Sequence, residues 1–229
     1  MIHSTIISWL LLWIIVFGIF FIMKQKGKGI TYTNNYSYII IYFMITTTIA
    51  IKLFYFPHNQ LTFTPISVLA IVLFYFTTIY IYKKIPQIYK RPVTFIKKYP
   101  DHYWAQMNYR YLVSKSFDII FQQTMIIIGV FMLYNAGLPL LTTIFYFFLL
   151  FAFIHLIGIS TAGKALGMFY FIASLFGAII FPILILSFKT GFIYSYIIHY
   201  SFYIGAGTFV WIRNHKKIRI INAGITRKY

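Results

Sequence analysis

The chain has 229 residues, of which 61% are hydrophobic and 10% are charged, whereas soluble domains are about half apolar and about a quarter charged. This composition excludes a water-soluble globule, because too few polar side chains are present to cover its surface. There are 20 Lys and Arg residues against 2 acidic residues. The chain has no Cys, which excludes disulfides and thiolate metal sites.

Seven apolar segments are long enough to cross a hydrocarbon core of about 30 Å, which takes roughly 20 helical residues. In chain order they lie near residues 2–23, 36–55, 65–82, 111–134, 138–158, 165–187 and 191–212. The first is expected to be a retained helix, because its start, MIHST, carries no Lys or Arg and no small-residue cleavage site follows. We therefore predict an all-α fold, a polytopic transmembrane helix bundle of about seven helices that forms a single membrane domain over residues 1–229.

The connections between these segments alternate between basic and nearly uncharged. Lys and Arg gather in every second connection and in the tail, at 24–35, 83–110, 159–164 and 213–229. Basic connections remain on the cytoplasmic side of a membrane, so we expect the N-terminus outside and the C-terminus inside. The domain then has four parts: a three-helix part at 1–82, a basic interfacial inner loop at 83–110, a four-helix core at 111–212 and a basic inner tail at 213–229.

The inner loop at 83–110 interleaves basic and aromatic residues and contains prolines at 86, 92 and 100. Such a segment suits the headgroup layer, where aromatic rings and lysines meet lipid phosphates. We therefore expect a bilayer with an anionic inner leaflet as a partner. The same residue types also bind single-stranded nucleic acid, but their position beside apolar segments favours lipid, and no nucleic-acid partner is expected.

Ionisable side chains within a bilayer cost about 2.5–3.5 kcal/mol on insertion scales, so each is a candidate for function. Lys115 and Asp118 are three residues apart on one expected helix, where their side chains can form an ion pair. Asp118 and Gln122 are four apart and share a face of that helix. Two histidines on other expected helices, His155 and His199, could meet this polar group inside the bundle.

Three motifs follow one another within residues 111–207. Phe151-Ala-Phe-Ile-His155 matches a Phe-x-x-x-His motif in full, and His199 in TGFIYSYIIHYSFY lies where a His-x-x-x-Asn motif begins. The segment FQQTMIIIG places Gln122 and Gln123 where a Glu-Glu-x-x-x-Arg motif has its glutamates. In their order and spacing these segments resemble the CPBP (Abi) family of intramembrane metalloproteases, which includes the CAAX prenyl endoprotease. The resemblance implies the CPBP-like fold for the core at 111–212.

The sequence departs from that family at the positions that carry its chemistry. The two glutamate positions are Gln122 and Gln123, the Arg position is Ile127, and the Asn position is Tyr203. A neutral amide cannot take a proton from water, and it is a poor zinc ligand beside a carboxylate. The resemblance therefore implies a degenerate member, a pseudoprotease, for which we expect no cofactor.

One arrangement would restore a metal site. Asp118, His155 and His199 would supply one carboxylate and two imidazoles around an open position, as in catalytic zinc sites. This alternative predicts bound zinc and an active intramembrane metal-dependent endopeptidase of the CAAX-protease type.

We expect a non-proteolytic scaffold that binds a membrane-protein partner, or that holds a lipid or isoprenoid chain in the former active-site cavity. The endopeptidase is the first alternative. The second is a transporter, with Asp118 as its buried acid, or a small subunit of a larger membrane complex. The expected location is a bacterial-type plasma membrane, with an organellar inner membrane as the alternative.

Overall fold

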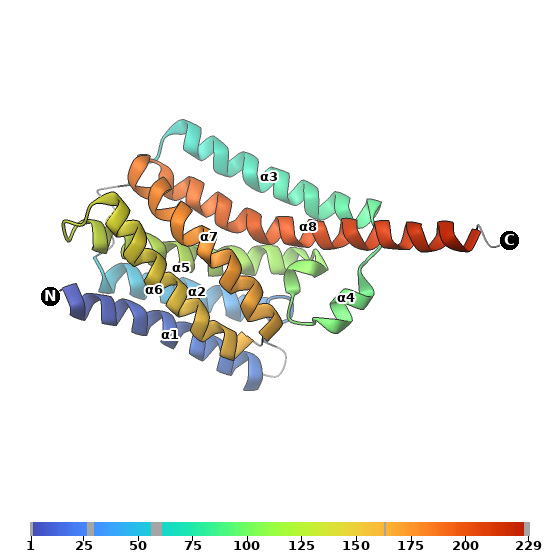
Figure 1. Ribbon diagram of the computed structural model, residues 1–229, viewed down its shortest axis with the longest axis horizontal. Coiled ribbons are helices and arrows are strands. Elements are labelled where there is room, and N and C mark those ends of the chain that lie inside the picture. Colours follow the sequence, from blue (N-terminus) through green and yellow to red (C-terminus); the bar gives the residue numbers. More distant parts are fainter. Residues whose placement is uncertain (1, 27–29, 56–60, 163, 227–229) are drawn as a thin grey trace.

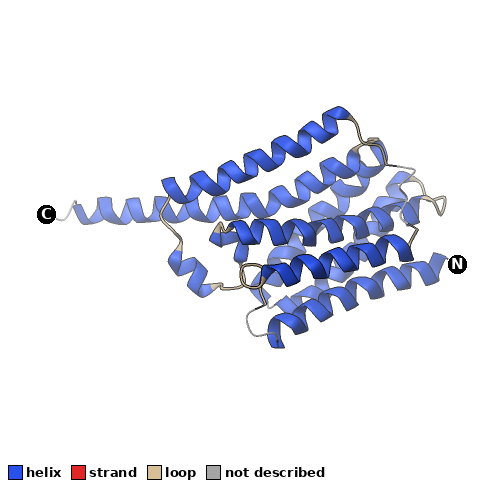
Figure 2. Ribbon diagram, turned by 180° about the vertical axis from the view of Figure 1, so that it is seen from behind, coloured by secondary structure: helices blue, strands red, loops and turns tan. Residues whose placement is uncertain are grey.

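The computed structural model describes residues 2–26, 30–55, 61–162 and 164–226, and all regular secondary structure within these ranges is helical. The elements are α1 (Ile2–Lys26), α2 (Tyr36–Leu53), α3 (Pro65–Ile88), α4 (Val93–Lys98), the short 3-10 helix η2 (Tyr103–Gln106), α5 (Tyr109–Tyr134), α6 (Leu140–Ala162), α7 (Lys164–Ser187) and α8 (Gly191–Thr226). Helices α1, α3, α6 and α8 run toward the end of the bundle where α4 lies, and α2, α5 and α7 run back (Figure 1). Seen from behind, the same elements form one helical bundle (Figure 2). The prediction of an all-α bundle is confirmed.

Within the described ranges, six helices are long and apolar enough to cross a membrane. They cover Ser4–Gln25, Tyr36–Leu53, Pro65–Ile88, Tyr109–Tyr134, Leu140–Ile159 and Lys164–Ser187. These helices identify an integral membrane protein. The seventh predicted span, 191–212, lies within α8, which is not one of the six and which continues past the bundle to Thr226 (Figure 1). A seventh crossing and the orientation therefore remain predictions.

The helix starts follow from local sequence. Thr64 caps α3 through a reciprocal hydrogen-bonded box with Ser67, and Pro65 occupies the first turn, where its missing N–H costs nothing. The Asn108 side chain accepts a hydrogen bond from the backbone N–H of Arg110 at the start of α5. Between α5 and α6 the chain turns at Gly137, whose φ of 85° favours glycine. These signals set where α5 begins and ends, and α5 carries most of the polar residues of interest.

Helix α5 is the centre of the bundle and contacts α1, α2, α6, α7 and α8. The indole Nε1 of Trp9 donates a 2.8 Å hydrogen bond to the carbonyl of Met125. This hydrogen bond joins α1 to α5. Gly129 permits this contact, because a Cβ there would lie 2.8 Å from the Trp9 ring. By contrast, α3 packs mainly against α8 and leaves large side chains such as Phe76 exposed. Such a face suits contact with lipid.

The predicted inner loop at 83–110 is more ordered than its sequence indicated. Helix α3 continues through Pro86 to Ile88, and α4 and η2 follow. In η2, Trp104 and Ala105 are buried, and the Ala105 carbonyl accepts a 2.7 Å hydrogen bond from the Trp211 indole of α8. Gly207 of α8 lies directly against this segment, since a Cβ there would be 2.5 Å from the Trp104 carbonyl oxygen. The η2 part of the loop is therefore docked on α8.

Candidate functional site: two adjoining cavities beside a buried ion pair

The buried carboxylate of Asp118, on α5, accepts three hydrogen bonds. Its Oδ2 receives the ammonium of Lys115 at 2.5 Å and the phenol of Tyr32 at 2.6 Å, and its Oδ1 receives the amide of Gln122 at 2.7 Å. Asp118 itself is 0% exposed. These four residues are called the Asp118 cluster below. The predicted ion pair and the predicted Asp118–Gln122 contact are both confirmed.

The ammonium of Lys115 is stabilised by aromatic rings as well as by the carboxylate of Asp118. Its Nζ lies 4.2 Å from the centre of the Tyr203 ring and 5.4 Å from that of Tyr32. Aromatic faces attract cations, and more strongly where water is excluded. Tyr32 stays a neutral donor, because burial raises its pKa and the neighbouring Asp118 raises it further. The cluster is thus electrically balanced without any additional group.

The two glutamines at the motif positions form hydrogen bonds with different helices. Gln122 belongs to the Asp118 cluster, whereas the Gln123 amide donates to the hydroxyl of Ser195 on α8. Adjacent residues on a helix point about 100° apart, and here the two side chains have different partners. In this structure both amides support packing within the bundle.

The larger of two cavities lies between α1, α5, α6 and α7 and has a volume of about 260 Å³. Its walls are mostly apolar and include Phe17, Ile154 and Leu166, and the Asp118 cluster forms its polar wall. Gly18 of α1 and Gly158 of α6 also line it, and a Cβ at either position would meet no atom within 4 Å. The space beside these glycines is therefore open.

A second ion pair lies at the rim of the larger cavity, near α4. Lys24 at the end of α1 contacts Asp101, between α4 and η2, with 2.6 Å from Nζ to Oδ1. The two side chains are 24% and 45% exposed, so water reaches the cavity here. Lys24 also lies 5.7 Å from the ring centre of Tyr103. Lys24 and Asp101 are called the rim pair below.

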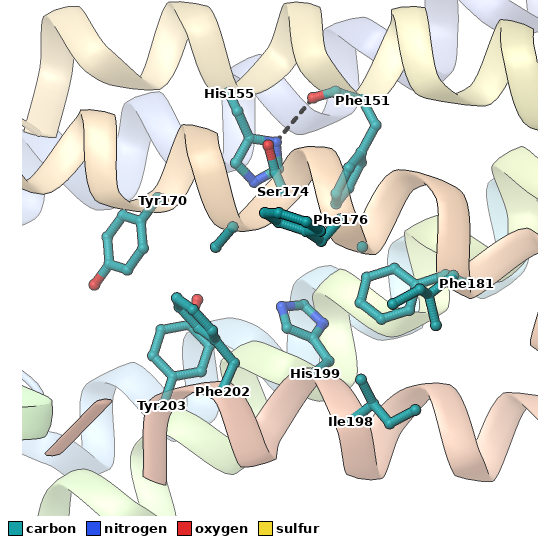
Figure 3. Close-up of a pocket in the computed structure, with 13 residues that line it drawn as sticks. Phe151, His155, Tyr170, Ser174, Phe176, Phe181, Ile198, His199, Phe202 and Tyr203 are labelled. Carbon is teal, nitrogen blue, oxygen red and sulfur yellow. Dashed lines mark hydrogen bonds between the residues drawn. The ribbon is translucent and has the colours of Figure 1, made fainter. Parts of the chain in front are cut away.

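The smaller cavity, of about 130 Å³, lies between α6, α7 and α8. His155 and His199 project toward it from opposite sides (Figure 3). His155 Nδ1 lies 2.8 Å from the Phe151 carbonyl oxygen, and because a carbonyl only accepts, Nδ1 carries the proton and Nε2 keeps its lone pair. His155, Tyr170 and Tyr203 line both cavities, so the two spaces adjoin.

The three predicted metal ligands are brought near each other only in part. His155 and His199 share the smaller cavity, whereas Asp118 lies in its ion pair on the wall of the larger one. Among the residues that the structure describes, no three His, Asp or Glu side chains form a set that could hold a metal ion. This arrangement does not present the three donors to one point, and zinc binding stays a prediction.

Comparison with protein-family models, curated proteins and solved structures finds no match to this chain. The resemblance to the CPBP family therefore stays a prediction that rests on the motif residues. A function has to be argued from the cavities and from the charges that line them.

Sequence reasoning found Asp118 but missed three partners of the larger cavity. Tyr32 lies 86 residues before Asp118 in the chain, and Lys24 and Asp101 lie in two different predicted connections, 24–35 and 83–110. The scarcity of acids was the available signal, because the chain has 2 acidic residues and both line this cavity. Scarcity alone does not say which lysine or tyrosine an acid contacts.

Proposed function

We propose that this protein holds a hydrocarbon chain of a lipid or isoprenoid in the larger cavity and does not cleave peptide bonds. The observation that carries the proposal is an apolar cavity whose polar wall is already neutralised by its own ion pair. Its volume of about 260 Å³ lies just under the range of about 300–1,000 Å³ that encloses whole small ligands. Such a space suits one chain of an amphiphile whose remainder stays in the bilayer.

The state of Asp118 supports a role without proteolysis. A general base must have a lone pair directed at the water that it activates. Asp118 directs its oxygens at Lys115, Tyr32 and Gln122 instead. The replacement of both motif glutamates by amides supports the same conclusion.

The proposal extends to the membrane arrangement. We place α8 across the membrane as a seventh helix, with the N-terminus outside and the end that carries α4 inside, because Lys and Arg gather in the connections at that end. The membrane is then a bacterial-type plasma membrane or an organellar inner membrane, with anionic lipid at the inner face. The exposed faces of α3 would contact lipid or a membrane-protein partner.

The test is to fill the cavity without disturbing the protein. In Gly18→Leu and Gly158→Leu the new side chain enters open space in the cavity. Gly205→Leu is the matched control, because a Cβ at Gly205 also meets nothing within 4 Å but this residue does not line the cavity. Native mass spectrometry of each protein released from detergent reports retained lipid. We expect lipid on the wild type and on Gly205→Leu, and loss of lipid from the two cavity variants. Equal lipid retention by all four proteins would contradict the proposal.

A second candidate, the metal-dependent endopeptidase, is favoured by one observation. His155 keeps an Nε2 lone pair, and His199 shares its cavity from the opposite helix. Elemental analysis of the purified protein beside a His155→Ala/His199→Ala variant separates the candidates. Stoichiometric zinc that disappears in the variant would support the peptidase, and its loss in Asp118→Asn would make Asp118 the third ligand.

A further inference from the structure

Both acidic residues of the chain face the larger cavity, although Lys and Arg outnumber them 20 to 2. Asp118 has a structural role, because it neutralises Lys115 inside the bundle. Asp101 is placed differently, since its side chain is 45% exposed and its partner Lys24 lies near the end of α1 and is 24% exposed. The function proposed above does not explain why an acid stands at the rim.

The partial exposure of the rim pair allows a ligand group to replace either Lys24 or Asp101. Pairs between solvent-exposed side chains contribute little to stability, because water replaces much of the lost interaction. The Asp101 side chain is 45% exposed, and it lies on the connection between α4 and η2 rather than within a helix. A ligand group of the right charge can therefore take the place of either partner at small cost.

The two titratable side chains that follow Asp101 in the chain are neutral. Burial and, to a smaller extent, the neighbouring Asp101 raise the pKa of Tyr103 to about 12, so the phenol beside the pair is neutral. Burial lowers the pKa of His102, which keeps that imidazole neutral near pH 7. The rim pair thus offers one ammonium and one carboxylate side by side.

Resting on the proposed function, we infer that the rim pair recognises the head of a zwitterionic lipid that carries a phosphate and a primary ammonium. The phosphate takes the place of Asp101 at Lys24, and the ammonium takes the place of Lys24 at Asp101. The apolar chain of the same lipid enters the cavity beside Gly18 and Gly158. In this arrangement the head lies at the charged rim and the chain lies in the apolar part of the cavity.

Charge matching is the basis of the selectivity. A zwitterionic head replaces each partner by a group of the same sign and leaves neither side chain unpaired. An anionic head would pair with Lys24 and leave Asp101 facing a phosphate of like charge. A choline head carries its charge on a quaternary nitrogen, which has no N–H to donate to the Asp101 carboxylate. Hydrogen bonds to charged groups are stronger than neutral ones, so both alternatives should bind more weakly.

The experiment compares three phospholipids with identical acyl chains on the delipidated wild-type protein by native mass spectrometry. We expect phosphatidylethanolamine to bind about tenfold more tightly than phosphatidylglycerol or phosphatidylcholine, the ratio that one charged hydrogen bond supplies. In Asp101→Asn the preference over phosphatidylglycerol should disappear, because Lys24 then lacks a competing carboxylate. Lys52→Gln, which changes a lysine that does not line the cavity, should keep the preference.

The outcomes separate this inference from the function on which it rests. Equal binding of all three lipids, or tighter binding of phosphatidylglycerol, would overturn the inference and leave the chain-binding function intact. Binding of none of them would overturn both. If Asp101→Asn does not fold, the exchanged pair Lys24→Asp/Asp101→Lys keeps a balanced rim and should keep the preference for the zwitterion. Loss of the preference in that folded variant would count against charge matching.

Discussion

Two lysine–aspartate pairs face the same cavity, and they differ in depth and in how the chain builds them. The deep pair, Lys115 and Asp118, has side chains that are 6% and 0% exposed, and the two residues are neighbours on one helix. The rim pair, Lys24 and Asp101, has side chains that are 24% and 45% exposed, and its residues come from separate segments. The same two residue types therefore serve as a fixed part of the core in one place and as an exchangeable contact in the other.

The reason is the cost of an unpaired charge. Removing one partner of a buried pair leaves the other charge without solvent, whereas an exposed charge regains water. Depth thus decides whether a pair can open for a ligand. Substitutions at the two pairs and beside them measure this difference.

Asp118→Asn should destabilise the protein most. The change leaves the Lys115 ammonium buried without a carboxylate, and breaking such a pair costs about 3–5 kcal/mol. Thermal unfolding in detergent, followed by Trp fluorescence, should show a large fall in the midpoint. An unchanged midpoint would mean that the deep pair is not part of the core.

The matched control for that variant removes both charges. Lys115→Met/Asp118→Leu replaces the pair by apolar side chains of similar size, which is often neutral or stabilising for buried pairs. Its unfolding midpoint should be well above that of Asp118→Asn, although Tyr32 and Gln122 lose an acceptor. If the double variant is the less stable of the two, the loss arises from the Tyr32 and Gln122 hydrogen bonds and not from an unpaired charge.

Gly207→Ala should have the next largest effect, because it disturbs the segment that carries the rim pair. Its Cβ would lie 2.5 Å from the backbone carbonyl of Trp104, and overpacking of this kind costs about 1–3 kcal/mol. Gly205→Ala on the same helix meets nothing within 4 Å, so it should be neutral or stabilising by up to about 1 kcal/mol. The difference between the two unfolding midpoints measures how firmly η2 is docked on α8. Equal midpoints would refute the docking.

Asp101→Asn should change stability little, by about 0–1 kcal/mol, because the side chains of Asp101 and Lys24 are both partly exposed. The comparison with Asp118→Asn in the same detergent is the most direct measure of the difference between the two pairs. A loss as large as that of Asp118→Asn would show that the rim pair is structural and not free to exchange.

The smallest expected effect is the loss of stability at acid pH that arises from His102, the residue next to Asp101. Burial lowers the pKa of His102, while Asp101 opposes this shift only in part. The unfolded chain therefore takes up a proton near pH 6.5 and the folded protein only at lower pH, so stability falls as pH drops below about 6.5. His102→Phe keeps the aromatic packing against Trp104. Between pH 7.5 and 5.5, the unfolding midpoint of this variant should fall less than that of the wild type. Equal losses would assign the acid sensitivity to other groups.

The helices were predictable because each is a long apolar run between polar or glycine-containing connections, and such runs have one stable form in lipid. The predicted span at 36–55 agrees with α2 within two residues at its end. The span predicted at 65–82 is too short, because α3 continues through Pro86 to Ile88. The span predicted at 191–212 lies within α8, which continues as a helix to Thr226.

The site was predictable only where its residues share a helix. Spacing alone identified the Lys115–Asp118 pair and the Asp118–Gln122 contact, since positions three and four apart meet on a helix. The rim pair and Tyr32 depend on how α1 and the segment before α5 pack, and periodicity contains no information on that packing. The motifs located His155 and His199 at one cavity, but the third donor proposed for them is held in a pair of its own.

The central claim, that a hydrocarbon chain occupies the larger cavity, is tested most directly by photolabelling in membranes. A phospholipid with a photoreactive diazirine midway along one chain would be incorporated, and labelled positions would be read by peptide mass spectrometry in the wild type and in Gly158→Leu. We predict strong labelling at the cavity-lining stretches 14–21 and 154–158 that falls sharply in Gly158→Leu, while labelling of the exposed face of α3 stays constant. Labelling of both regions that does not respond to Gly158→Leu would mean that lipid only coats the outside of the bundle, and the claim would be wrong.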